Sequence, residues 1–427
     1  MPLKVLIAGA GIGGPALAFW LCRIGCTTTV IERSPNLRAT GQQVDFFGQG
    51  LPVARMMGIE NDLRAVAVKE PGMRLIDYKG QSKAYFPASD GISATTDLEV
   101  MRGDVVNILY RLTKDLDSVN YVFGNHIIGL SQDETKVHVT FANGTTENYD
   151  MVVGADGINS PTRKMMLGPS FPDHRFDLGV HMAYFTAPAQ KGDPKDWTVC
   201  HVPGGKAIMT RKDKEENIRV YLATRGGCES LDAAKTLADR KAAWAQIFEG
   251  TVGAQADRFM RDLQESPEAD DLFDQHLTQI RLPEGAWSKG RIVLLGDAAH
   301  CPAPVGRGGG TTSALIGAYL LTGELFKQLK ENGHNPKAVD VERAAKEYER
   351  ILRPSVWEKQ NIGTTRISAF FPRSSLGISI IHTMGWLVAK WPFGMPSRGE
   401  ESSKLLYPDY FGLESAIERD QAHNAIH

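Results

Sequence analysis

A glycine pattern near the N-terminus has the residue types and spacing that bind a dinucleotide. Gly9, Gly11 and Gly14 follow directly on the apolar residues 4–8, and helical apolar spacing begins after them. In such a GxGxxG pattern the first glycine permits a tight turn, the second lets a pyrophosphate approach the backbone, and the third lets helix and strand pack closely. Glu32 stands about 20 residues farther on, where an acidic side chain binds a ribose diol. The pattern therefore predicts an unphosphorylated adenosine nucleotide, as in FAD or NAD.

Two carboxylates follow apolar, strand-like runs farther along the chain. Asp156 stands in a Gly-Ala-Asp-Gly sequence after residues 151–153, and Asp297 in a Gly-Asp-Ala-Ala-His sequence after residues 291–295. Open α/β sheets bind ligands at the carboxyl ends of their strands, so we expect both aspartates at the same edge as the glycine pattern. His300, which ends the second sequence, is expected to be structural rather than a catalytic acid or base.

Together the three motifs resemble the signatures of the para-hydroxybenzoate hydroxylase-like family of flavin monooxygenases. All three are present in the family's order, and the resemblance covers most of residues 4–330. It implies a resident, non-covalent FAD and NADPH or NADH that binds only transiently. It also implies that dioxygen is used, through a flavin C4a-hydroperoxide, to hydroxylate an electron-rich aromatic substrate.

The resemblance implies specific contacts with the flavin. Asp297 would bond the ribityl hydroxyls, Asp156 would support the nucleotide, and Arg102 occupies the place of an arginine that reaches the flavin. A helix that begins near Thr311, where relatives commonly carry asparagine, would direct its positive end at the reduced ring. The full expected cofactor-binding set is Gly9, Gly11, Gly13, Gly14, Glu32, Arg33, Gln43, Arg102, Asp156, Gly157, Gly296, Asp297, Pro304, Gly306, Gly309, Gly310 and Thr311.

The catalytic acid or base is not specified by a motif. Phenols react best as phenolates, so a basic or hydrogen-bonding side chain near the substrate hydroxyl would help. The candidates, each of which could equally be a strand residue with a structural partner, are His181, Tyr184, His201, Arg211 and Tyr221. Residues 41–45 resemble a flavin-lining segment in the branch that contains tetracycline-inactivating and natural-product monooxygenases. That resemblance favours a bulky polycyclic or polyketide-like phenol.

The motifs require a parallel sheet to position them, and the pattern between them predicts an inserted second domain. Several strand-like runs from about residue 176 to 222 precede a helical stretch. Residues 291–295 are again a continuous apolar run, as in a parallel strand that is buried on both faces. We expect an α/β fold with three parts. They are a Rossmann-type FAD-binding domain of residues 1–72, 98–172 and 286–340, an antiparallel-sheet substrate domain of residues 73–97 and 173–285, and a C-terminal helical region of residues 341–427.

Composition bounds the class of protein. A chain of 427 residues suggests about two or three domains, and 42% hydrophobic and 23% charged residues are ordinary for a globular protein. The formal net charge of −2 argues against a nucleic-acid partner. The five cysteines are scattered, which indicates a reducing compartment without disulfides, and no second Cys/His pair completes a metal site with Cys22 and Cys26. No signal peptide is recognisable, so a cytoplasmic monomer or homodimer is expected.

Several alternatives stay open. One is an FAD enzyme of non-hydroxylating type, for epoxidation, Baeyer-Villiger-like or other oxidative ring chemistry, including antibiotic inactivation. Another is a flavin-binding, membrane-associated partner protein, suggested by the apolar residues 376–391. That stretch is shorter than the roughly 20 residues that a spanning helix needs and contains His382 and Lys390. It predicts a C-terminal helix that covers the flavin site or forms a subunit contact, with peripheral membrane docking as the alternative.

Overall fold

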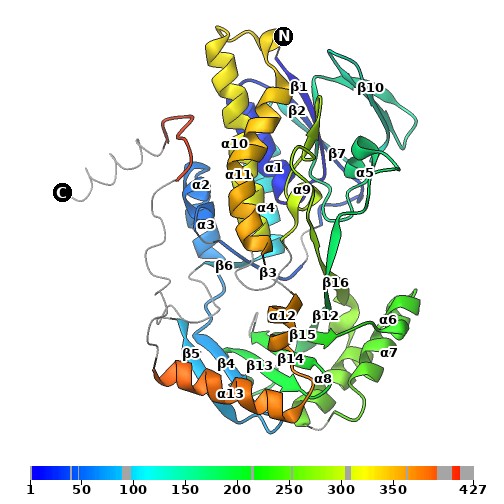
Figure 1. Ribbon diagram of the computed structural model, residues 1–427, viewed down its shortest axis with the longest axis vertical. Coiled ribbons are helices and arrows are strands. Elements are labelled where there is room, and N and C mark those ends of the chain that lie inside the picture. The colour runs from blue at the N-terminus through cyan, green and yellow to red at the C-terminus, as the bar shows by residue number, and fades with distance from the viewer. Residues whose placement is uncertain are drawn as a thin grey trace, which may run out of the picture.

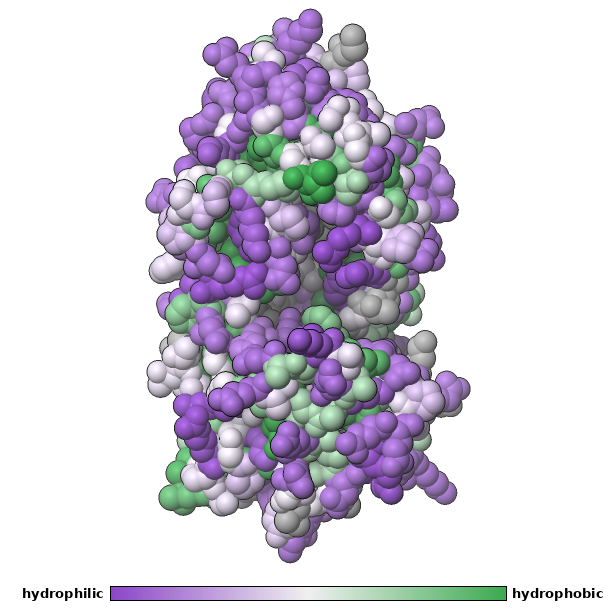
Figure 2. Space-filling model, turned by 90° about the vertical axis from the view of Figure 1, so that its right-hand side faces the viewer, coloured by the Kyte–Doolittle hydropathy of each residue, from purple (hydrophilic) through white to green (hydrophobic). Residues whose placement is uncertain are grey.

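Two sheets organise the molecule into two lobes that are stacked along its long axis (Figure 1). The computed structural model describes residues 2–38, 41–46, 48–88, 98–212, 216–251, 253–302, 309–361, 364–391 and 406–413. On the face shown in Figure 2, hydrophilic side chains predominate and hydrophobic ones form small groups between them.

The first lobe is built on a six-stranded sheet with the order β17-β18-β11-β1-β2-β7. All neighbours are parallel except β17 and β18. The α/β fold with a parallel sheet is thereby confirmed. The strands are β1 (Lys4–Ala8), β2 (Thr27–Glu32), β7 (Val119–Phe123), β11 (Met151–Gly154), β17 (Ser288–Lys289) and β18 (Ile292–Leu294).

Helices cover this sheet because its central strands are apolar on both faces. Four helices of the first lobe pack against one another and the sheet: α1 (Gly13–Arg23), α4 (Arg102–Thr113), α10 (Gly310–Glu331) and α11 (Val341–Gln360). Most of α10 is buried all round, as expected for a helix in the centre of a large domain. The smaller helices are α2 (Gly50–Met56), α3 (Glu60–Ala65), α5 (Pro161–Leu167) and α9 (Asp297–His300).

Two small sheets complete the first lobe. One is the meander of β8 (Ile127–Gln132), β9 (Val137–Phe141) and β10 (Thr146–Tyr149), and the other pairs β3 (Gln43–Asp45) with β6 (Glu99–Met101). The turn expected at Asn143-Gly144 joins β9 and β10, and Gly144 has a φ of +83° there.

The second lobe contains a seven-stranded sheet with the order β16-β12-β15-β14-β13-β4-β5. Its neighbours are antiparallel except β13 and β4, which are parallel. β4 and β5 come from an earlier segment of the chain and lie at the sheet edge. The strands are β4 (Gly72–Ile76), β5 (Ser82–Pro87), β12 (Arg175–Pro188), β13 (Trp197–Val202), β14 (Lys206–Lys212), β15 (Asn217–Arg225) and β16 (Phe273–Ile280). The exact domain boundaries given above stay a prediction.

The longest strand, β12, differs from the short strands that the sequence suggested. Of its 14 residues, Val180–Pro188 pair with β15 and Arg175–Tyr184 pair with β16. The pairing with β16 has a register shift between Asp177 and His181. Alternate residues of β12 face opposite sides. Ala183 and Phe185 pack toward α6 (Glu229–Ala233), α7 (Leu237–Ile247) and α8 (Ala254–Glu265), whereas Met182 and Tyr184 face the first lobe.

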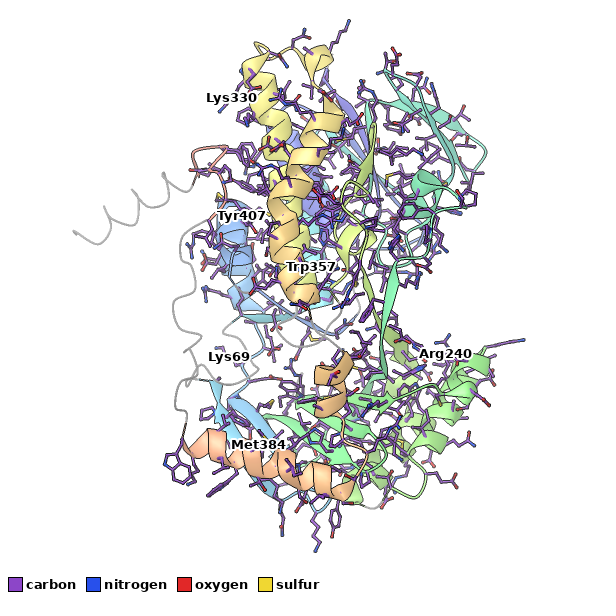
Figure 3. The ribbon with its side chains drawn as sticks, in the orientation of Figure 1. Lys69, Arg240, Lys330, Trp357, Met384 and Tyr407 are labelled. Atoms are coloured by element: carbon purple, nitrogen blue, oxygen red, sulfur yellow. The ribbon has the colours of Figure 1, made fainter. Side chains whose placement is uncertain are left out.

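The C-terminal part continues as α12 (Thr364–Phe370) and α13 (Ser375–Lys390) after α11. The apolar stretch expected to form a helix is therefore helical, and it packs on β5. Leu376, Ile380 and Met384 on this helix are exposed, and Met384 is labelled in Figure 3. None of the described helices has the length and apolar character needed to cross a bilayer.

A substitution at Trp244 of α7 tests how the core beneath the second sheet is packed. Its fully buried side chain packs in one cluster with Phe248 and Phe259. We expect Trp244→Ala to lower the free energy of unfolding by about 3–5 kcal/mol, because it leaves a cavity in that cluster. Urea unfolding followed by circular dichroism measures the change.

The matched control is Trp357→Ala, because Trp357 on α11 is 62% exposed (Figure 3). It should change stability by no more than about 0.5 kcal/mol. Equal effects of the two substitutions would contradict the packing described for α7.

Candidate functional site

A cavity of about 1110 Å³ lies between the carboxyl-terminal edge of the first sheet and one face of the second. Ligand pockets usually measure about 300–1,000 Å³, so the cavity has room for a cofactor and a substrate together. The first lobe contributes Gly11, Gly13, Arg102, Gly157, Asp297 and Gly310, and the second contributes Met73, Met182, Tyr184, Trp197, Met209, Arg211 and Tyr221. The C-terminal part adds Lys359, Ile367, Phe370 and Phe371.

The N-terminal glycines form a cradle that side chains would fill. A Cβ at Gly14 would lie 2.0 Å from the carbonyl oxygen of Gly9. Gly9 itself has a φ of +110°, and a Cβ there would lie 2.5 Å from the Ala155 carbonyl oxygen. This close approach leaves exposed backbone at the start of α1, which fits the pyrophosphate of a dinucleotide.

Glu32 lies beneath the same turn. Its Oε2 accepts a hydrogen bond from the Ala10 amide at 3.2 Å, and its Oε1 accepts one from the Ser34 amide at 2.9 Å. The carboxylate is thus fixed at the end of β2, where a ribose diol is recognised in dinucleotide-binding folds.

The two motif aspartates have different surroundings. Asp156 accepts hydrogen bonds from the Ser160 hydroxyl and from the amide and hydroxyl of Thr162, the latter two at 3.0 and 2.7 Å. Its carboxylate therefore ties down the start of α5 and is not among the residues that line the cavity. Asp297 does line the cavity, as does Arg102. Burial raises the pKa of Asp297, and Arg102 opposes that rise.

The N-terminus of α10 also faces the cavity. Gly309 precedes the helix with a φ of +113° and provides no side-chain cap, and Gly310 and Thr311 follow it in the cavity wall. Uncapped amides carry partial positive charge, which suits an anionic ring edge.

Lys359 adds a cationic side chain to this end of the cavity, and sequence reasoning missed it. Its Nζ lies 3.0 Å from the Ser313 hydroxyl of α10, and burial lowers its pKa to about 8. No motif marks this lysine, because it reaches the site only through the packing of α11 on α10.

The expected cofactor-binding residues fall into three groups. Pro304 and Gly306 lie outside the described residues. Gly9, Gly14, Glu32, Arg33 and Asp156 do not line the cavity, and Arg33 is exposed. Those that line it are Gly11, Gly13, Gln43, Arg102, Gly157, Gly296, Asp297, Gly309, Gly310 and Thr311. A contact of each with a flavin stays a prediction.

A buried charged cluster forms part of the opposite wall. An Arg211 nitrogen, Nη1, donates to Glu99 Oε1 at 2.5 Å and to the Gln43 amide oxygen. Arg211 Nε lies 3.5 Å from Glu70 Oε1, and the guanidinium stacks over Trp197. Sequence reasoning had singled out Arg211 and Gln43 but neither glutamate.

The two glutamates hold their protons to a higher pH than ordinary carboxyl groups. Burial raises the pKa of Glu70 and of Glu99, and it outweighs the lowering effect of Arg211. For Arg211, burial alone would lower the pKa, but Glu99 and Glu70 raise it on balance. The buried guanidinium of Arg211 thus has carboxyl groups beside it as counter-charges, as low-dielectric surroundings require.

The five catalytic candidates differ in whether they line the cavity. Tyr184, Arg211 and Tyr221 line the cavity, and the two tyrosine rings meet edge to face at 5.1 Å. Burial raises the pKa of Tyr184 to about 12, so its hydroxyl stays protonated near neutral pH. His181 and His201 are buried but do not line the cavity. His201 instead packs against Phe370.

His300 is packed in the first lobe away from the cavity. Its ring lies against Trp287 with centroids 4.5 Å apart, and Nε2 lies 3.4 Å from the Tyr348 hydroxyl. Burial lowers its pKa to about 3, so the ring is neutral. The structural role expected for this histidine agrees with its surroundings.

Comparisons with known proteins identify the family. A family model described as an FAD binding domain matches residues 2–340. The flavin-dependent monooxygenase eupH of a Phoma species is 57% identical over 423 residues, which cover 96% of this chain and 98% of the relative. The FAD-dependent monooxygenase asL4 of Sarocladium schorii is 35% identical, over 90% of this chain and 91% of the relative.

Solved structures agree with this family. The tetracycline destructase Tet(55) matches with a TM-score of 0.72 and 27% identity, over 92% of this chain and 98% of that one. Klebsiella pneumoniae HpxO, complexed with FAD and uric acid, matches with a TM-score of 0.71 over 90% and 93% of the two chains. At 19% identity this likeness concerns the fold alone. The chain therefore belongs to the family of flavin-dependent monooxygenases with an FAD binding domain.

Proposed function

We propose that this flavin-dependent monooxygenase uses NADPH or NADH to hydroxylate a bulky phenolic substrate. The observation that carries the proposal is the wall of the cavity on the second sheet. Its aromatic and methionine side chains, Tyr184, Trp197, Tyr221, Met182 and Met209, surround the buried cation of Arg211. Such a surface suits a flat, apolar ring system with a polar oxygen at one point.

The chain offers separate groups for the cofactor. The backbone of the glycine turn, Glu32, Arg102, Asp297 and the N-terminus of α10 would hold FAD, which supplies the activation of dioxygen. The positive end of α10 and the Lys359 ammonium would favour negative charge on the ring. The apolar wall of the second sheet would exclude water from the same space.

The Arg211 cluster gives the substrate oxygen a proton acceptor and a counter-charge. An ionised carboxylate of the Glu70 and Glu99 pair would take the phenol proton, and the fixed guanidinium would stabilise the phenolate that forms. The protonated hydroxyls of Tyr184 and Tyr221 would donate hydrogen bonds to substrate oxygens.

Oxidative inactivation of a polycyclic antibiotic is a second candidate function. It is favoured by the likeness at 27% identity to solved tetracycline destructases. Both functions use the same cavity, and they differ in the substrate that the second sheet accepts.

The first test is a substrate screen. We expect phenols and polycyclic natural products, tetracycline included, to stimulate NADPH or NADH oxidation with matched oxygen uptake. Mass spectrometry with isotopically labelled dioxygen should show one labelled oxygen in the product. Turnover that does not need oxygen would contradict the proposal, and activity on tetracycline alone would favour the second candidate.

Asp297→Ala tests the cofactor side of the cavity. Removing a buried charged hydrogen-bonding group costs about 1.5–3 kcal/mol, so FAD should bind roughly tenfold or more weakly. Flavin fluorescence titration of the apoprotein measures the affinity. Asp239→Ala, which removes an exposed aspartate from the first turn of α7 in the other lobe, is the control and should keep full affinity. Unchanged FAD binding by Asp297→Ala would show that this carboxylate does not hold the cofactor.

Glu99→Gln tests the proton acceptor. Because burial raises the pKa of the Glu99 carboxyl, this group can accept the phenol proton only after it has ionised. The hydroxylation rate of the wild type should therefore rise with pH through that pKa and then level off. In the variant the rate should no longer rise with pH, and it should be about 100-fold or more below that of the wild type. FAD should remain bound.

Oxygen uptake at a saturating phenol concentration, measured across pH, is the readout. Glu249→Gln, at an exposed position after α7, is the control and should keep both the rate and the profile. A Glu99→Gln enzyme with the wild-type rate and pH profile would remove the glutamate pair from the mechanism.

A further inference from the structure

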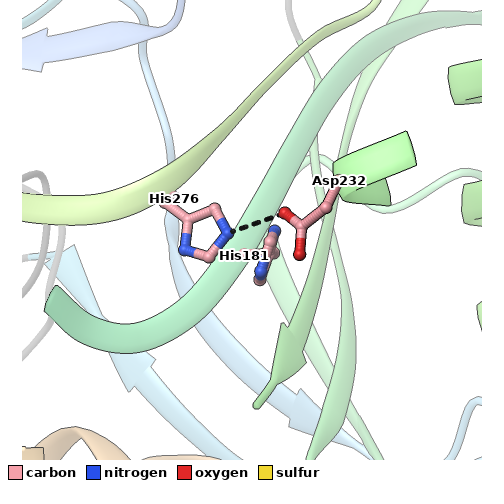
Figure 4. A group of neighbouring side chains, drawn as sticks. All are labelled: His181, Asp232 and His276. Carbon is pink, nitrogen blue, oxygen red and sulfur yellow. Dashed lines mark ion pairs between the residues drawn. The ribbon is translucent and has the colours of Figure 1, made fainter. Parts of the chain in front are cut away.

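Three potential metal ligands meet at the edge of the second sheet, where β12, β16 and α6 come together. His181 of β12 and His276 of β16 are directly opposite in the strand pairing. Asp232 of α6 approaches the same point (Figure 4). One ligand atom from each of the three side chains lies within 4.8 Å of the others.

His181 lacks the partner that a buried imidazole requires. The residue is only 4% exposed, and its Nε2 has no hydrogen-bond partner within the part of the chain that the structure describes. A buried nitrogen without a partner is destabilising, because it has lost its hydrogen bonds to water and gained none to the protein.

The two imidazole rings approach each other closely. Their centroids are 3.3 Å apart with planes inclined at 59°, and no hydrogen bond joins them in the described structure. Only His181 is buried, whereas His276 and Asp232 are exposed. A cation held by all three side chains would give the buried Nε2 of His181 a partner.

His276 has a carboxylate near each of its two ring nitrogens. Its Nε2 lies 3.6 Å from Asp232 Oδ1, and its Nδ1 lies 3.8 Å from Asp177 Oδ2. Histidines that bind a metal through one nitrogen are commonly oriented by a carboxylate on the other. Asp177 is itself held, because its Oδ1 accepts the Gly179 amide at 2.8 Å.

We propose that His181, Asp232 and His276 form a binding site for a divalent late transition-metal ion such as Zn²⁺. Two imidazoles and one carboxylate suit Zn²⁺, whereas Mg²⁺ and Ca²⁺ prefer oxygen ligands alone. Three protein ligands leave a coordination position for water. The ion would clamp α6 to the two strands β12 and β16. Because His276 also belongs to the cavity wall, that clamp would steady one side of the substrate site.

Another histidine of this chain shows what an ordinary surface pair looks like. His138 hydrogen-bonds through its two ring nitrogens to Asp133 and Asn148, both at 2.8 Å, and it is not buried. It has a carboxylate partner but no orphaned nitrogen and no second histidine. His138→Gln is therefore the matched control for a substitution at His276.

The experiment is a titration of untagged, FAD-loaded, chelator-treated protein with ZnCl₂ by isothermal titration calorimetry. We expect one ion per chain. His276→Gln and Asp232→Asn should each weaken the affinity by about tenfold or more, and His138→Gln should leave it unchanged. Both substituted positions are exposed, so the variants should fold even if a change at the buried His181 does not.

A second measurement assigns the ligands. CoCl₂ should give visible absorption beyond the flavin bands with the wild type, and this signal should be lost in His276→Gln. Cys228→Ser should keep the signal, because Cys228 precedes α6 but is not one of the three ligands. Absence of Zn²⁺ binding, wild-type affinity in both ligand variants, or loss of binding in Cys228→Ser would overturn the proposal. These readouts measure binding without turnover, so they are independent of the proposed hydroxylation.

Discussion

The parallel register of three central strands is the constraint on which the site depends. Ala8 pairs with Gly154, and Gly154 pairs with Leu294, so β1, β11 and β18 end side by side. Segments that are far apart in sequence therefore leave the sheet at one edge. The narrow contact between the turn at Gly9 and the carbonyl of Ala155 is a consequence of that register, since a larger residue would force the strands apart.

The fold of the first lobe could be predicted from the sequence because each of its motifs lies within one short segment. Each strand and the loop after it form one short, contiguous pattern, and a parallel sheet brings such loops together without further specification. Asp156 shows the limit of this reasoning. A motif places the residue in a loop but not the direction of its carboxylate, which Ser160 and Thr162 bind instead. The signal available was Ser160 followed by Pro161, a recognisable start of a helix.

The second lobe was less predictable because its contacts join distant segments without a motif. Glu70, Glu99 and Arg211 meet only because β4 docks beside β13 in parallel and β6 pairs with β3. Nothing in the local pattern separates these glutamates from exposed ones. The pair of His181 and His276 has the same origin, since their opposition depends on the register shift in β12. Strand alternation alone could indicate only which residues share a face.

The long strand β12 has a mechanical consequence. Before Val180, where pairing with β15 begins, it pairs with β16 alone, from Arg175 opposite Ile280 to Asp177 opposite Thr278, and these two strands run between the lobes (Figure 1). The Ile280 amide donates to the Cys301 carbonyl, so the upper end of this strand pair is anchored beside Asp297. The two walls of the cavity are therefore joined by continuous, hydrogen-bonded backbone, which limits how far apart they can lie.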